Sequence, residues 1–331
     1  MLWTEVYNPS KLEQILGQEN VTRYLSSFAK RRSVPHLALF GPHGTGKSTA
    51  VGCFARELYG ESWEANTVVF PAADLFLQGK GFLEQDDRYS HLYQKGQSLI
   101  NNFKHILKWY ASIRPLDAEF KLMVFEDAHA LTRDAQAALR RIMEQYSPTC
   151  RFVFTTTNQS ALIPAITSRC LPLFFAPVDS EIILAHLQRI SREETNVSFP
   201  CTGDELELIQ QTAQGDMRRA ILLLQIALDA GKCDDVLAVT ASETTNIAAS
   251  AINSLRDGET RKAVKQLESL MIEYGLSGDE VFSEIRTIIQ REYNHPLLAI
   301  ALADAEYRLQ HCNSEYIQTG SFAASTRGVF P

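Results

Sequence analysis

The chain has 331 residues, of which 45% are hydrophobic, 21% charged and 9% aromatic. This composition excludes a disordered, collagen-like or coiled-coil chain, and the length favours two or three domains over one. Acidic residues exceed basic residues by 39 to 32, so the net charge of −7 excludes a uniformly basic nucleic-acid coat protein but not a local basic surface.

The first half of the chain contains five short apolar runs separated by segments with helical periodicity. Near-continuous apolar runs are typical of strands buried on both faces, and strands that alternate with helices predict a parallel α/β sheet. The predicted strands cover residues 37–40, 68–70, 122–125, 152–156 and 171–175.

The second half of the chain has only helical patterns. After a predicted linker at 176–180, Ser180 is the predicted cap of a helix that ends near Arg192. Thr202 and Glu205 form a predicted capping box, and an apolar helix is predicted over 217–228. Helices are also predicted between 242 and 308, and we expect the last dozen residues to fray.

The cysteines indicate a reducing compartment. The six cysteines are scattered, with no CxxC pair and no Cys/His cluster at metal-ligand spacing. The sequence contains no run of about 18 apolar residues that would cross a membrane. We therefore expect a soluble intracellular protein.

A phosphate-binding loop follows the first predicted strand. Residues 41–49 read GPHGTGKST and lead into a helical run. Glycines let backbone N–H groups turn toward phosphates, and the helix N-terminus adds positive potential. Lys47 would reach the β and γ phosphates of ATP, and Ser48 would hold Mg²⁺. The alternative is a glycine-rich turn without a ligand. The predicted binding residues are Gly41, Pro42, His43, Gly44, Thr45, Gly46, Lys47, Ser48 and Thr49.

An acidic pair follows the third predicted strand, in the segment KLMVFEDAH. A P-loop ATPase needs carboxylates at this position to hold the water shell of the metal and to polarise the attacking water. Glu126 is the predicted ligand of Mg²⁺ through water, and Asp127 is the predicted catalytic carboxylate. The alternative is an acidic pair at the end of a surface strand.

Several further segments resemble one known family. They are WTEVYNPSKLEQILGQE near the start, TRDAQAALRRIMEQYSPTCRFVFTTTNQSALIPAITSRC from Thr132, GDMRRA, and ADAEYRLQHCNSEYIQ. Together they resemble the archaeal-type small subunit of replication factor C, a clamp loader of the AAA+ ATPase family. The resemblance implies an AAA+ domain with a five-stranded parallel sheet at 1–176. It also implies a small helical lid domain at 177–240 and an all-α collar domain at 241–331.

The resemblance also implies further site residues. Asn158 matches the sensor-1 position that orients the attacking water. Arg169, in the motif Ser-Arg-Cys, matches an arginine finger that acts on ATP in the adjacent subunit, and Arg218 matches sensor 2, a contact from the lid to the γ-phosphate. The implied adenine pocket contains Tyr7, Pro9, Leu16 and Gly17.

The chain departs from the family in several places. Val6 and Asn8 replace a lysine and an arginine around the tyrosine of the adenine pocket. The acidic pair is reversed, Glu then Asp instead of Asp then Glu, which makes the catalytic carboxylate one methylene shorter and predicts slower hydrolysis. The segment 71–97 also diverges.

The sequence signals for surfaces that contact DNA or the clamp are less specific than those for the nucleotide site. Thr132 is the predicted cap of a helix whose apolar face is Ala135, Leu139, Ile142, Met143 and Tyr146. Arg133 is the best DNA candidate, followed by Lys104 and Lys108, and the alternative is a solvated helix face. Gln136 is implied to couple DNA contact to the ATPase site. A clamp contact is the hypothesis for Leu75, Phe76, Leu77, Phe82 and Leu83, and the alternative is that they cap the core.

The favoured function is an ATPase subunit of a pentameric clamp loader that opens the sliding clamp and loads it onto primed DNA. The implied partners are large and small loader subunits, the clamp and primer-template DNA. No membrane association is expected. The implied location is the cytoplasm, in association with the nucleoid, for an archaeal-type protein and the nucleus for a eukaryotic one. One alternative is a nucleotide-binding structural subunit with little or no hydrolysis, which the reversed acidic pair supports. A branch-migration helicase is a weaker alternative that the SRC and ALRRIME motifs oppose.

Overall fold

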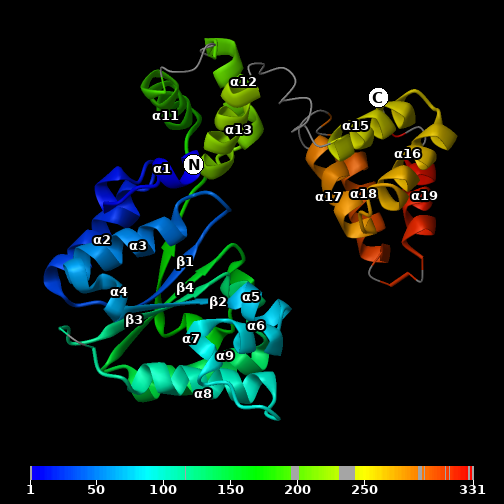
Figure 1. The fold of residues 1–331 in the computed structure, drawn as a ribbon. Helices are drawn as coiled ribbons and strands as arrows, with labels where there is room; N and C mark the ends of the chain where they lie inside the picture. The colour runs from blue at the N-terminus through cyan, green and yellow to red at the C-terminus, as the bar shows by residue number, and fades with distance from the viewer. Residues whose placement is uncertain are drawn as a thin grey trace. The chain divides into compact units, whose positions relative to one another are not determined.

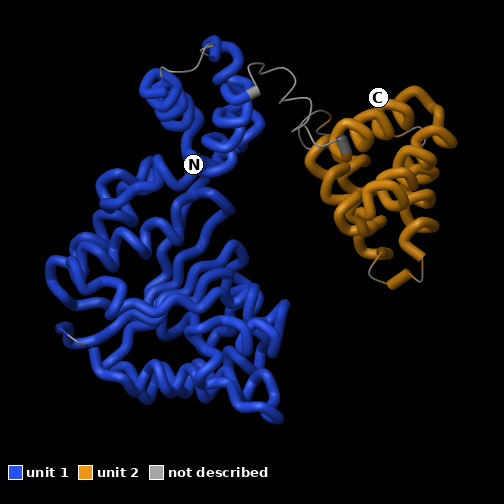
Figure 2. Tube along the Cα trace, in the orientation of Figure 1, with its two compact units in different colours: residues 1–231 blue, residues 232–331 orange. Residues whose placement is uncertain are grey.

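The structure is a computed structural model, and it divides the chain into two compact units, residues 1–231 and 232–331 (Figure 2). It describes residues 2–115, 117–194, 201–230, 243–289, 293, 295–309, 311–312, 314–326 and 329. Within these ranges no helix is both long and apolar enough to cross a membrane.

A five-stranded parallel sheet forms the centre of the first unit, with strand order β2-β3-β4-β1-β5 (Figure 1). The strands are β1 (His36–Phe40), β2 (Thr67–Pro71), β3 (Lys121–Glu126), β4 (Cys150–Thr156) and β5 (Cys170–Phe174). They confirm the five predicted strands to within two residues at each end. Because all strands run in the same direction, the loops after β1, β3 and β4 lie at one edge of the sheet.

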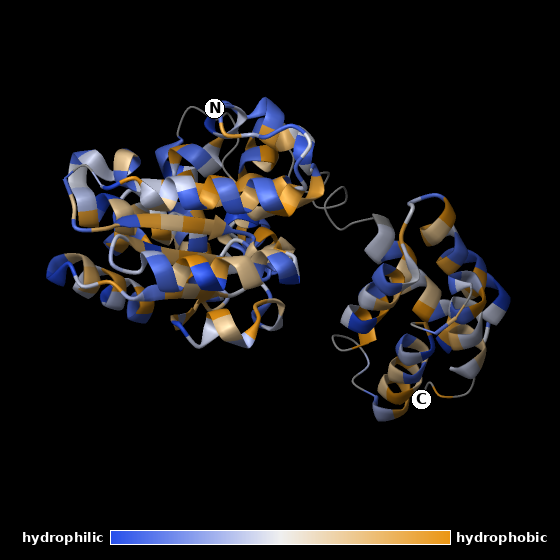
Figure 3. Cartoon of the chain, turned by 90° about the horizontal axis from the view of Figure 1, so that it is seen from below, coloured by the Kyte–Doolittle hydropathy of each residue, from blue (hydrophilic) through white to orange (hydrophobic). Residues whose placement is uncertain are grey.

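Helices cover both faces of the sheet. Leu37 and Leu39 of β1 pack on one face, while Ala38 and Phe40 pack on the other, as a period of two residues requires. The first face is covered by α2 (Glu19–Arg31), α3 (Lys47–Tyr59) and α4 (Trp63–Asn66), next to the short helices η1 (Leu12–Gln14) and η2 (Gly60–Ser62). The second face is covered by α5 (Ala72–Leu77), α6 (Lys80–Gln85), α7 (Asp87–Ser90), α8 (Leu99–Ser112) and α9 (Arg133–Tyr146). The strands are hydrophobic and the outer helix surfaces are largely polar (Figure 3).

Short helices follow β3 and β4 at the edge of the sheet. They are η3 (Ala128–Ala130), η4 (Gln159–Ala161) and α10 (Pro164–Thr167). The predicted cap of α9 is confirmed, because the Thr132 hydroxyl accepts a hydrogen bond from the Ala135 N–H at 3.3 Å. Ala135, Leu139, Ile142 and Met143 are buried as predicted, and Tyr146 is half-buried.

Three longer helices follow the sheet in the same unit: α11 (Ser180–Glu193), α12 (Gly203–Ala213) and α13 (Met217–Ala230). The prediction that Ser180 caps the first of them is wrong. Asp179 is the cap, because its carboxylate accepts a hydrogen bond from the Glu181 N–H at 2.9 Å and Ser180 is already helical. The capping box of Thr202 and Glu205 is confirmed. The N-terminal helix α1 (Trp3–Val6) packs against α13.

The described part of the second unit is all helical: α15 (Glu243–Arg256), α16 (Thr260–Ile272), α17 (Gly278–Ile288), α18 (Pro296–Leu309) and α19 (Glu315–Ser325). The expectation of a frayed end is wrong up to Ser325. Phe322 of α19 is buried and lies edge-on to Phe282 of α17, with the ring centroids 5.5 Å apart. The domain boundaries at 176 and 240 stay predictions, and the second lies outside the described residues.

The divergent segment 71–97 contributes several apolar side chains to the core. Leu75 and Leu83 are buried, and Phe76 and Phe82 pack against the same cluster. Leu77 differs from them, with 84% of its surface exposed. The structure therefore supports the core alternative for four of the five residues proposed to contact the clamp.

Candidate nucleotide-binding site

The glycine-rich loop joins β1 to α3, and Lys47 is the first residue of that helix. Its Nζ donates hydrogen bonds to the carbonyl oxygens of Gly41 at 2.7 Å and Pro42 at 2.5 Å. Burial lowers the pKa of Lys47, and the nearby Asp127 carboxylate opposes that shift. The ammonium is thus held inside the loop, where an anionic ligand would stabilise its charge.

Two glycines allow neighbouring segments to approach the loop closely. Gly41 has φ +153°, and a Cβ there would lie 2.3 Å from the carbonyl oxygen of Phe175. Gly44 has φ +66°, and a Cβ there would lie 1.6 Å from Oδ1 of Asp216. The Gly44 carbonyl also accepts a hydrogen bond from the Met217 N–H at 3.2 Å. These contacts place the start of α13 directly on the phosphate-binding loop.

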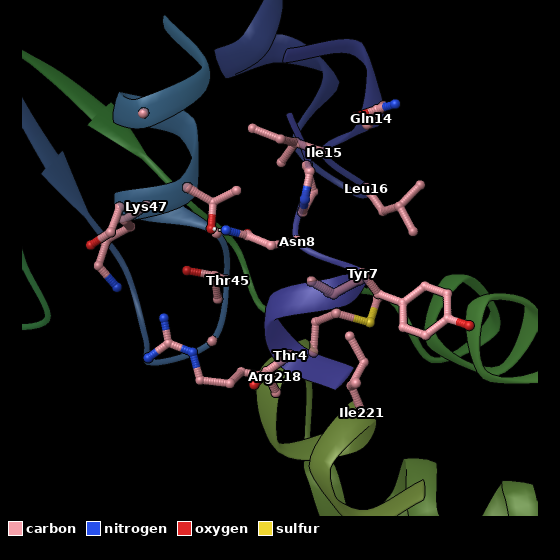
Figure 4. A pocket seen from close by; sticks show the side chains of 18 of the residues that line it. Thr4, Tyr7, Asn8, Gln14, Ile15, Leu16, Thr45, Lys47, Arg218 and Ile221 are labelled. Carbon is pink, nitrogen blue, oxygen red and sulfur yellow. Dashed lines mark hydrogen bonds between the residues drawn. The ribbon is translucent and has the colours of Figure 1, made fainter. Parts of the chain in front are cut away.

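A cavity of about 1350 Å³ extends from this loop (Figure 4). Its walls come from the N-terminal segment, the loop, the end of β3 and the helices α11 and α13. The cavity brings together most of the predicted nucleotide-binding and catalytic residues. These are Tyr7, Pro9, Leu16, His43, Gly44, Thr45, Gly46, Lys47, Ser48, Thr49, Glu126, Asp127 and Arg218.

The acidic pair enters the cavity from the end of β3. Asp127 has φ +49°, a left-handed conformation that aspartate adopts more readily than most residues. Its negative charge acts on Lys47, so the carboxylate and the ammonium lie within electrostatic reach of each other. Glu126 and the Ser48 side chain line the same cavity.

This set of residues fits Mg²⁺ that is bound together with a nucleotide. The described residues contain no group of three or more His, Cys, Asp or Glu side chains that could hold a metal ion. Mg²⁺ commonly takes only one or two protein ligands and completes its shell with waters and substrate phosphates. One carboxylate and one hydroxyl beside a phosphate-binding loop match that mode of binding.

Arg218 lies in the first turn of α13, and its charge lowers the pKa of Lys47. The two side chains point toward the same part of the cavity (Figure 4). Two neighbouring cations that line one cavity favour a polyanionic ligand such as a triphosphate.

Asn158 and Arg169 are not among the residues that line the cavity. The Asn158 Oδ1 accepts hydrogen bonds from the N–H and the hydroxyl of Ser160, at 3.0 and 2.7 Å. Thr155 of β4 lines the cavity instead. Arg169 forms an ion pair with Glu144 of α9 at 2.5 Å and donates to the Ala165 carbonyl oxygen at 2.7 Å. Neither predicted role is visible within one subunit.

Three of the predicted binding residues do not line the cavity themselves: Gly17, Gly41 and Pro42. Gly17 lies against Val178, at the entry to α11. Gly41 and Pro42 provide the carbonyl groups that hold Lys47.

Sequence reasoning missed the contribution of α11. Ile182, Ala185, His186 and Arg189 line the cavity from this helix, and burial lowers the pKa of His186. The helical spacing of these residues was an available signal, because positions three and four apart share one face. It did not show what that face would contact.

The candidate DNA residues lie on two helices that pack side by side. Lys104 is half-buried and Lys108 exposed on α8, while Arg133 is exposed at the start of α9. Gln136 of α9 is buried. Its side chain donates to the carbonyl oxygens of Leu131 and Ala161, at 3.0 and 2.8 Å, and accepts from the Ile163 N–H at 2.8 Å. Gln136 therefore ties α9 to the loop after β4.

Two family models match parts of the chain, and curated relatives match nearly all of it. A family model described as replication factor C C-terminal domain matches residues 239–325, and one described as DNA polymerase III, delta subunit, matches residues 17–179. The replication factor C small subunit of Methanocella arvoryzae is 34% identical over 98% of this chain and 95% of its own length. That of Archaeoglobus fulgidus is 32% identical over 98% and 96%. The chain belongs to the replication factor C small-subunit family.

The fold of this replication factor C small-subunit homologue is similar to that of solved structures. The Thermotoga maritima RuvB Holliday junction branch migration motor has a TM-score of 0.53 and 17% sequence identity, over 89% of this chain and 91% of that one. This similarity confirms the AAA+ P-loop ATPase fold. The chain is thus a member of a clamp-loader family with an AAA+ fold.

Proposed function

We propose that this chain is an ATPase subunit of a pentameric clamp loader, which opens the sliding clamp and loads it onto primed DNA. The observation that carries the proposal is the cavity, which joins the phosphate-binding loop, the carboxylates after β3 and Arg218 of α13. Membership of the replication factor C small-subunit family supports the clamp and the primed DNA as partners. Clamp loading would take place in the compartment that contains the chromosomal DNA.

Each residue of the cavity has a role in this proposal. Lys47 and the N–H groups of the loop bind the β and γ phosphates, and Arg218 binds the γ-phosphate from α13. Ser48 and, through water, Glu126 hold Mg²⁺, which neutralises charge on the phosphates. Asp127 accepts a proton from the attacking water. Asn158, which does not line the cavity and whose Oδ1 accepts from Ser160, is proposed to turn toward that water and orient it.

Arg169 is proposed to complete the site of an adjacent subunit. A guanidinium neutralises charge on the transferred phosphoryl group, and an arginine in this role can be supplied in trans. The ion pair with Glu144 holds Arg169 on its own subunit, so this contact must open before Arg169 reaches a neighbouring nucleotide. Assembly is therefore expected to change the partner of Arg169.

The second unit is proposed to form the collar that joins the subunits. Leu297, Ile300 and Tyr307 of α18 are 55%, 64% and 68% exposed, and their spacing places them on one face of the helix. Exposed apolar side chains in a row are typical of a surface that another protein covers.

A structural subunit with little hydrolysis remains the alternative proposal. The reversed acidic pair favours it, because the side chain of Asp127 is one methylene shorter than the glutamate that the family usually has at this position. The same cavity would then bind ATP for assembly, and the chain would contribute Arg169 and the collar. ATP turnover by an Asp127→Asn variant separates the two proposals.

Lys47→Ala tests nucleotide binding at this site. Loss of a hydrogen-bonded charge to the phosphates costs about 2 kcal/mol, so we expect roughly 30-fold weaker binding of ATP to the full chain. Titration of a fluorescent ATP analogue measures the affinity. Lys30→Ala, an exposed lysine in the last turn of α2, is the control with unchanged affinity. Equal affinity of wild type and Lys47→Ala would overturn the proposed site.

A further inference from the structure

The N-terminal segment links α11 and α13 to the phosphate-binding helix α3. The backbone N–H of Trp3 donates a hydrogen bond to Oε1 of Gln225 in α13 at 2.9 Å, and the Trp3 indole is buried. The Trp3 ring lies edge-on to the Tyr7 ring, with the centroids 6.2 Å apart. Residues 3–7 are therefore attached to the helices that follow the sheet.

Tyr7 makes a second contact to those helices. Its hydroxyl donates a hydrogen bond to Oε1 of Glu194, the C-cap residue directly after α11, at 2.8 Å. Burial, with the neighbouring Glu194 carboxylate, raises the pKa of Tyr7 to about 12. The hydroxyl thus remains a donor at any physiological pH. A hydrogen bond to a carboxylate is stronger than one between neutral groups.

The next residues of the segment contact α3 instead. The Thr49 hydroxyl donates to Oδ1 of Asn8 at 3.1 Å, and the Cys53 thiol donates to the Pro9 carbonyl oxygen at 3.2 Å. The segment therefore changes partner between Tyr7 and Asn8. Figure 4 shows the two side chains on opposite sides of the segment, with Asn8 toward the loop and Tyr7 away from it.

We propose that the hydrogen bond between Tyr7 and Glu194 is a latch that slows the release of nucleotide from the cavity. Tyr7 and Asn8 both line the cavity, as do residues of α11 and α13. Since the segment connects these helices to α3, separation of α11 from the loop must first break a contact at one of its two ends. Tyr7 and Glu194 are positioning residues in this inference, which rests on the proposed binding of nucleotide.

The test measures the release of a fluorescent ATP analogue from the full chain, chased with unlabelled ATP in a stopped-flow instrument. Tyr7→Phe and Glu194→Gln are each expected to release the analogue roughly tenfold faster, since each weakens or removes one charge-assisted hydrogen bond. The association rate is expected to stay the same. The double variant is expected to release the analogue no faster than the faster single variant, because both changes act on the same bond.

Two matched controls separate the latch from general effects. Tyr24→Phe changes an exposed tyrosine of α2 outside the cavity, and Glu207→Gln changes an exposed carboxylate of α12 that does not line the cavity. Both are expected to release the analogue at the wild-type rate. A wild-type rate in Tyr7→Phe and Glu194→Gln, or multiplying effects in the double variant, would overturn the latch. Absence of nucleotide binding in the wild type would instead contradict the proposed function itself.

Discussion

Arg169→Ala is expected to lower stimulated ATP hydrolysis by roughly 10³-fold at each site that this arginine completes in the assembled loader. The reason is the loss of a cation that stabilises the charge of the transition state. Rapid-quench measurement with clamp and primed DNA gives the fraction of sites that hydrolyse ATP in the first turnover. We expect this fraction to fall by the share of sites that face Arg169, while the remaining sites keep their rate.

The ion pair between Arg169 and Glu144 provides a control for structural effects. The hydrogen bond from Arg169 holds the pKa of Glu144 below its usual range, so the pair is charged at neutral pH. Glu144→Gln removes the pair but keeps the arginine, and it is expected to keep the first-turnover fraction. A normal fraction in Arg169→Ala would show that no site depends on this arginine.

Asp127→Asn is expected to lower ATP hydrolysis at this subunit's own site by at least roughly a hundredfold, because the amide cannot accept the proton of the attacking water. Asparagine is nearly the same size as aspartate and also adopts the left-handed conformation found at this position. We therefore expect the fold and the binding of ATP to be kept. Steady-state turnover of the loader with clamp and primed DNA measures the effect.

The same variant decides between the active subunit and the structural subunit. Asp134→Asn, in the exposed first turn of α9 and outside the cavity, is the matched control and should hydrolyse ATP at the wild-type rate. If Asp127→Asn and the wild type have equal turnover and equal first-turnover fractions, the chain is the structural subunit.

The sheet and the phosphate-binding loop were predictable because their signals are local. The apolar runs that form β1 and β3 are buried on both faces, and the loop has a fixed spacing of glycines, Lys47 and Ser48. Helix caps were less certain, since Asp179 and Ser180 are both good capping residues and the chain uses the first. The end of the chain was mispredicted because its small polar residues are typical of a frayed terminus. The burial of Phe322 nevertheless stabilises the helix α19 there.

The contacts around the cavity were not predictable from one sequence. Tyr7 and Glu194 are 187 positions apart, and Gly44 meets Asp216 across a similar distance in the chain. No periodicity or spacing links such residues, because their proximity depends on how α11 and α13 pack against the loop. The partner of Arg169 was hidden for the same reason, and its proposed partner in a second subunit lies outside this chain.

Retention of the clamp on primed circular DNA shows whether ATP bound in this cavity drives clamp loading. The loader is assembled with wild-type chain or with Lys47→Ala, and the clamp that stays on the DNA is counted after addition of ATP. We expect ATP-dependent retention with the wild type and little retention with Lys47→Ala. Equal retention with both chains would contradict the claim that ATP in this cavity drives clamp loading.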